Sequence, residues 1–176
     1  MNFPNDLNAS TPFPIYAYTE PMFRVTVSVV VFVENMVAMV NDPVINRYIY
    51  NFPTATVKAG GETIQFAAVR KVKEDTGIVL QKEALIPVDF RNTPKEYVES
   101  LNSIDIGMTC MIDKLTLEEA KAKIPFDSNT NWYEVDFEEK KVKTGNAHAP
   151  YLNDKNFYMD QNVLFERAVD VVLMVR

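Results

Sequence analysis

The stretch that decides the fold runs from Gly61 to Ile78 and reads GETIQFAAVRKVKEDTGI. Taken alone, it predicts a helix, because Thr63 can cap the N-terminus and Gly77 can supply the left-handed residue after the last turn. Small and apolar side chains recur in it at steps of three and four, which predicts one side that packs closely on a neighbouring element. The residues on that side are Ile64, Ala67 and Ala68.

Charged residues lie beside the packed side of this helix. Lys71 and Asp75 are four residues apart and adjoin the apolar residues, so we expect an ion pair between them. Arg70 and Glu74 have the same spacing and form a second pair on the adjacent face.

The same stretch resembles the Nudix box, the loop-helix-loop that binds magnesium and a diphosphate in the Nudix hydrolases. The family pattern is G-x5-E-x7-R-E-U-x-E-E-x-G-U, where U is aliphatic. Two positions depart from it: Thr56 stands at the first glycine, and Lys71 stands at the first carboxylate of the R-E-U triplet. The positions in register are Glu62, Arg70, Val72, Glu74, Asp75 (for glutamate), Gly77 and Ile78.

This resemblance implies a magnesium-dependent pyrophosphohydrolase that acts on acid anhydrides, with manganese as a possible substitute. Magnesium prefers carboxylate and water ligands, and the bound metal polarises a phosphoryl group and activates water. By resemblance, Glu74 and Asp75 are the surviving catalytic and metal-ligand positions. Glu62, Arg70 and Gly77 correspond to positions that hold the loop and orient the ligands.

The two departures alter this implied site. An ammonium group at Lys71 repels a divalent cation, and it can take the place of the metal while neutralising Asp75 and Glu74. Thr56 is expected to hamper a loop in which a glycine backbone would approach the metal closely. Magnesium binding is therefore expected to be weak or absent.

Three functions remain open for such a box. The leading interpretation is a protein that binds, with slow hydrolysis left open, a nucleoside diphosphate linked to another moiety. The alternatives are a catalytically inactive ligand sensor or assembly subunit, and an enzyme that takes its missing carboxylate from a loop. The sequence offers further candidate residues and does not select among them. Arg24, Arg47 and Arg91 are candidates for binding phosphates, and Trp132 and Tyr133 for stacking on a nucleobase. His148 is a candidate for a catalytic base or a phosphate contact, and the candidates for a relocated catalytic base are Glu118, Glu119, Glu138 and Glu139.

The order of patterns along the chain predicts an α/β (α+β) fold, with a Nudix-like mixed β-sheet flanked by helices. Residues 1–22 contain four prolines and predict an extended arm, followed by a Nudix-like domain over 23–176. Thr116 is expected to cap a helix over 117–123, and Asp160 a C-terminal helix. The predicted strands cover 25–33, 36–40, 44–50, 85–90, 106–112 and 132–137.

Composition narrows the expected partners. The formal net charge of -6 disfavours binding to nucleic acid, and no apolar run is long enough to cross a membrane. With one cysteine, Cys110, and one histidine, His148, the chain offers no internal disulfide and a poor zinc site. We expect a cytoplasmic protein with a nucleotide-like small-molecule ligand, and the aromatic arm suggests a homodimer or an assembly partner.

Overall fold

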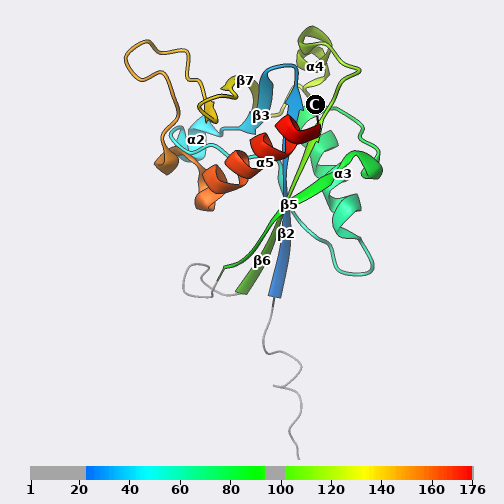
Figure 1. Ribbon diagram of the computed structural model, residues 1–176. Helices are drawn as coiled ribbons and strands as arrows, with labels where there is room; N and C mark the ends of the chain where they lie inside the picture. The colour runs from blue at the N-terminus through cyan, green and yellow to red at the C-terminus, as the bar shows by residue number, and fades with distance from the viewer. Residues whose placement is uncertain (1–22, 94–101, 176) are drawn as a thin grey trace, which may run out of the picture.

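The computed structural model describes residues 23–93 and 102–175 (Figure 1). The arm predicted over 1–22 lies outside the described residues. Within them, no helix is long and apolar enough to cross a membrane.

A mixed sheet forms the centre of the described structure. Its seven strands follow the order β5-β6-β2-β3-β7-β8, and β4 pairs with β2 beside this path. The long β2 and β6 run parallel, and the other pairs are antiparallel. The strands are β2 (Phe23–Val33), β3 (Met36–Val40), β4 (Thr54–Thr56), β5 (Ile86–Thr93), β6 (Asn102–Met111), β7 (Thr130–Asp136) and β8 (Lys141–Val142).

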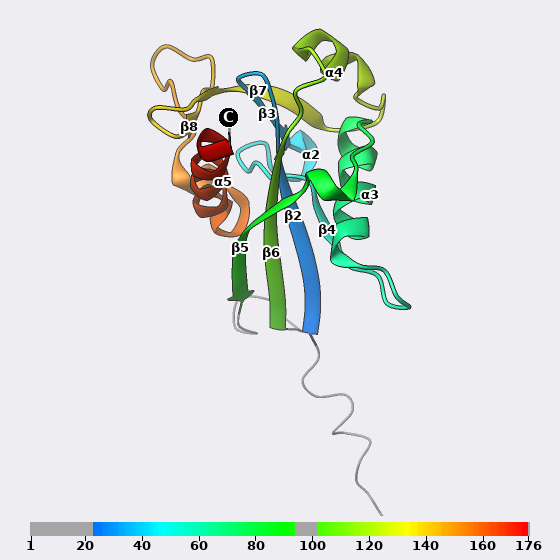
Figure 2. The same ribbon diagram turned by 45° about the vertical axis from the view of Figure 1, so that its right-hand side comes forward.

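The valine alternation of β2 separates the two faces of this sheet. Val27, Val29 and Val31 point to one face, where they pack against α3 (Ile64–Thr76). Val30 and Phe32 point to the other face, where α5 (Gln161–Val175) covers the sheet. Figure 2 shows the two helices on opposite sides of the strands. The expected mixed sheet flanked by helices is confirmed.

One predicted strand is wrong. Residues 44–50 do not form a strand; a short helix, α2 (Pro43–Asn46), takes up their first part. Asp42 caps this helix by accepting hydrogen bonds from the backbone N–H groups of Val44 and Ile45, and Pro43 occupies the first turn, where it suits a helix. These local signals outweigh the alternation of apolar residues that suggested a strand.

The remaining elements complete the chain. The expected helix α4 (Leu117–Lys123) is present, and the Thr116 hydroxyl caps it by accepting from the Glu119 N–H. The C-terminal helix is also present, but Asp160 has a φ of 61° and makes no capping hydrogen bond among the described residues. Short 3-10 turns are η1 (Lys82–Ala84), η2 (Asp154–Asn156) and η3 (Tyr158–Asp160).

Candidate functional site

The ends of helix α3 are set by its own sequence. Thr63 caps the N-terminus, where its hydroxyl accepts from the Phe66 N–H at 3.2 Å. Gly77 ends the helix with a φ of 75°, and its N–H donates to the Lys73 carbonyl at 2.9 Å. Ala67 and Ala68 are fully buried, so the helix lies close against β2. The predicted limits and packed side of this helix are confirmed.

Glu62 and Arg70 hold the loop before the helix. Arg70 Nε donates to Glu62 Oε2 at 2.8 Å, and its Nη2 donates to Glu62 Oε1 at 3.0 Å. The same Nη2 also donates to the Thr56 carbonyl at 3.2 Å, while the Lys58 N–H donates to Glu62 at 2.8 Å. This two-point ion pair therefore ties helix α3 to the loop and to strand β4.

The Glu62–Arg70 pair predicts how stability depends on pH. Hydrogen bonds from Arg70 and then from the Lys58 N–H lower the pKa of Glu62 from 4.5 to about 2. Because the folded pKa is depressed, the stabilisation is complete above pH 4.5 and is lost as the pH falls toward 2. We expect Glu62→Gln to lower the Tm at neutral pH and to flatten its fall below pH 4.5, measured by thermal denaturation.

A matched control is Glu83→Gln, at an exposed glutamate of η1 that makes none of the described ion pairs. It removes the same charge without disturbing the loop. Equal Tm-against-pH curves for the two variants would contradict the assigned role of Glu62.

The carboxylates at the other end of α3 face an ammonium group. Lys71 Nζ lies 3.2 Å from Asp75 Oδ1 and 3.8 Å from Glu74 Oε1, so the expected Lys71–Asp75 ion pair is present. Arg70 Nη1 approaches Glu74 at 3.5 Å from the other side. The Asp75 side chain is only 13% exposed, and burial raises its pKa above the usual value.

The residues present do not fit the magnesium ion that the resemblance implies. An octahedral magnesium site needs several oxygen ligands around open space, whereas Lys71 Nζ lies against both candidate ligands. Across residues 23–93 and 102–175, no group of three or more His, Cys, Asp or Glu side chains is placed to hold a metal ion.

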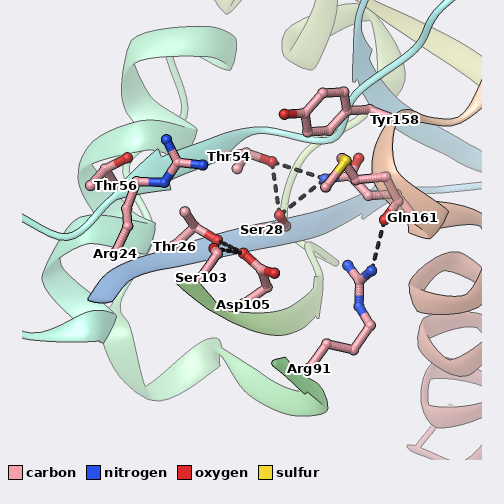
Figure 3. A pocket seen from close by; sticks show the side chains of 11 residues that line it. Arg24, Thr26, Ser28, Thr54, Thr56, Arg91, Ser103, Asp105, Tyr158 and Gln161 are labelled. Atoms are coloured by element: carbon pink, nitrogen blue, oxygen red, sulfur yellow. Dashed lines mark hydrogen bonds between the residues drawn. The ribbon is translucent and has the colours of Figure 1, made fainter. Parts of the chain in front are cut away.

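Thr56 connects the box to a pocket on the opposite face of the sheet. It is the last residue of β4, and its φ is not positive, so a threonine fits without strain where the pattern has glycine. Its side chain lines a cavity of about 170 Å³ beneath the N-terminal end of α5 (Figure 3). The expectation that Thr56 distorts the loop gains no support from this geometry.

The register of the sheet assembles this pocket from four neighbouring strands. Thr56 pairs with Thr26, Thr26 with Asp105, and Asp105 with Arg91, which forms one row across β4, β2, β6 and β5. Adjacent rows on the same face bring further polar residues to the pocket. These are Arg24 and Ser103 on one side, and Ser28 and Thr54 on the other.

The structure distinguishes the three arginines that the sequence left equivalent. Arg24 and Arg91 line the pocket, whereas Arg47 is exposed and stacks over the Tyr48 ring, 5.0 Å from its centroid. Arg24 Nε is buried and has no hydrogen-bond partner among the described residues. Arg91 donates to the Met159 carbonyl at 2.7 Å and lies 3.5 Å from Asp89. Arg24 therefore brings to this polar pocket a guanidinium group whose hydrogen bonding within the described residues is incomplete.

The other candidate residues lie elsewhere. His148 is on an exposed loop, and Trp132 is buried in the core on the α3 face. Tyr133 is half-buried and meets Tyr50 edge-on, with ring centroids 5.5 Å apart. Cys110 is buried, and this burial raises the pKa of its thiol to about 12, as in unreactive core cysteines.

Comparison with known proteins identifies the fold. No family model matches the chain, and no curated protein matches it. Among solved structures, the MutT/nudix family protein from Enterococcus faecalis matches with a TM-score of 0.66 and 16% identity, over 99% of this chain and 70% of that one. The MutT protein from Methanosarcina mazei Go1 matches with a TM-score of 0.53 and 16% identity, over 88% of this chain and 97% of that one. The E. coli dihydroneopterin triphosphate pyrophosphohydrolase matches with a TM-score of 0.50 and 16% identity, over 86% of this chain and 96% of that one.

Proposed function

With the Nudix fold as the premise, we propose that this protein binds a nucleoside diphosphate linked to another moiety and does not hydrolyse it by a metal-dependent route. The observation that carries this proposal is the position of the Lys71 ammonium, 3.2 Å from Asp75 and 3.8 Å from Glu74. By resemblance, those are the two metal-ligand positions that the box retains. A cation built into this place competes with any divalent metal.

The binding half of the proposal rests on the pocket beneath α5. Arginine is well suited to phosphate oxygens, because its planar guanidinium donates two parallel hydrogen bonds. Arg24 and Arg91 enter the pocket from β2 and β5, and Thr56 links the pocket to the box loop. A diphosphate bound here needs no metal to satisfy its charge, since these side chains can pair with it directly.

The direct test is ligand binding and turnover with and without magnesium. We expect calorimetry at neutral pH to detect binding of a nucleoside diphosphate sugar such as ADP-ribose in EDTA, with little added affinity in low-millimolar magnesium. We also expect no release of monophosphate from nucleoside diphosphate sugars, dinucleotides or nucleoside triphosphates. Turnover that requires both Glu74 and Asp75 would instead establish an active enzyme with a relocated base.

The other expectations from the sequence stay predictions. An assembly role would show as a stable oligomer that does not respond to nucleotide ligands. Cytoplasmic location and a homodimer through the arm also remain expectations from the sequence.

A further inference from the structure

The hydrogen bonds within the pocket beneath α5 fix which of its side-chain groups donate and which accept. The Phe52 N–H donates to Gln161 Oε1 at 2.8 Å, so Gln161 Nε2 is the donor to Ser28 and Thr54, both at 3.1 Å. The Thr54 hydroxyl donates to the Phe52 carbonyl at 2.8 Å. Its one proton is therefore used, and Ser28 must donate in the 2.8 Å contact between the two hydroxyls.

The hydroxyls of the next rows are oriented in the same way. Thr26 Oγ1 and Ser103 Oγ both donate to Asp105 Oδ1, the second at 2.7 Å. A hydroxyl has one proton and two lone pairs, so these hydroxyls have only acceptor capacity left for a ligand. The same holds for Ser28, which keeps one lone pair after accepting from Gln161. The floor of the pocket therefore accepts hydrogen bonds.

The donors of the pocket lie at its sides. Arg24 and Arg91 are the two cationic side chains that line it, and Arg91 brings N–H groups beyond those directed at Met159 and Asp89 (Figure 3). A ligand that matches this arrangement carries an anionic group at the arginines and hydrogen-bond donors over the floor.

The lining is unsuited to a nucleobase. Proteins commonly bind a nucleobase by stacking it on an aromatic face. Here the one aromatic ring that lines the cavity within the described chain is Tyr158, and it is 44% exposed. The floor beneath it is made of hydroxyls and a carboxylate.

We infer that this pocket recognises the sugar phosphate portion of the ligand, with the phosphate at Arg24 and the sugar hydroxyls donating to Ser28, Thr26 and Ser103. This inference rests on the proposed function, and it places the sugar phosphate end of the ligand in the pocket beneath α5. The base of the nucleoside then lies outside the pocket.

The test uses fragments of the ligand with the full-length protein. We expect calorimetry to show that ribose 5-phosphate binds at least about tenfold more tightly than inorganic phosphate, and more tightly than adenosine. Arg24→Gln should weaken ribose 5-phosphate and inorganic phosphate together. Ser28→Ala should weaken ribose 5-phosphate alone, because it removes a floor acceptor and leaves the arginines in place. Arg47→Gln, at an exposed arginine outside the pocket, should change neither.

Several results would overturn the inference. They are adenosine binding as tightly as ribose 5-phosphate, inorganic phosphate binding as tightly as the sugar phosphate, and no binding of ribose 5-phosphate. If ADP-ribose still binds in those cases, the proposed function stands and only the assignment of the sugar end is lost. If ribose 5-phosphate binds and ADP-ribose does not, the proposed function fails and the site remains one for a sugar phosphate.

Discussion

Lys71→Glu is expected to strengthen the binding of magnesium and manganese relative to the parent protein. The change replaces an ammonium, 3.2 Å from Asp75, by a third carboxylate on the same helix face. Opposite unit charges about 4 Å apart interact by about 4 kcal/mol at an effective dielectric constant near 20, so reversing one charge next to a cation site has a large effect. We expect at least about tenfold tighter metal binding by calorimetry.

The stability of this variant gives a second measurement. Without metal, the new carboxylate at position 71 and that of Glu74 repel the carboxylate of the largely buried Asp75, whose pKa burial already raises. We therefore expect a lower Tm than the parent in EDTA, and recovery of the Tm on addition of magnesium or manganese. Affinity for the metal should increase as the pH rises, because Asp75 must lose its proton to act as a ligand.

A matched control separates this geometry from a change in net charge. Lys73 is exposed and lies two residues away on α3, so Lys73→Glu adds the same charge on a different side of the helix. Asp75→Asn in the Lys71→Glu background should remove the gained affinity, since it keeps the shape of the side chain and deletes the ligand charge. Equal metal binding by the Lys71→Glu and Lys73→Glu variants would contradict the account of the site.

The parts of the fold that the sequence predicted correctly depend on local signals. Helix α3 begins after Thr63 and ends at Gly77, because its cap and its terminating glycine lie next to it in the chain. The faces of β2 follow from the alternation of its own valines. The error over 44–50 also has a local cause, since Asp42 and Pro43 start a helix within a run that alternates like a strand.

The pocket could not be predicted in this way, because its geometry depends on long-range register. Thr56, Thr26, Asp105 and Arg91 become neighbours only when β4, β2, β6 and β5 pair as they do. The polar positions of β2 were visible in the sequence as interruptions of an apolar run. Their role in the pocket could not be predicted, because it depends on the position of α5, which leaves a cavity over this end of the sheet face.

Gly77→Ala is expected to be among the most destabilising single changes in the chain, with a loss of about 2–5 kcal/mol in the free energy of unfolding. Two costs combine here. The φ of 75° lies in the left-handed region, which costs a residue with a Cβ about 1–2 kcal/mol. An added Cβ would also lie 1.8 Å from the carbonyl oxygen of Lys123, at the end of α4, so a backbone segment must move.

Gly145→Ala separates these two costs. Gly145 has a similar φ of 81°, but a Cβ there meets nothing within 4 Å, so this variant carries the conformational cost alone, about 1–2 kcal/mol. Urea denaturation of both variants measures the difference, which reports the contact between the end of α3 and α4. Since domains of this kind are stable by only about 5–15 kcal/mol, the Gly77 variant should unfold at a much lower urea concentration. Similar losses for the two variants would show that α4 moves away at little cost. The glycine of the box would then be required for its backbone conformation alone.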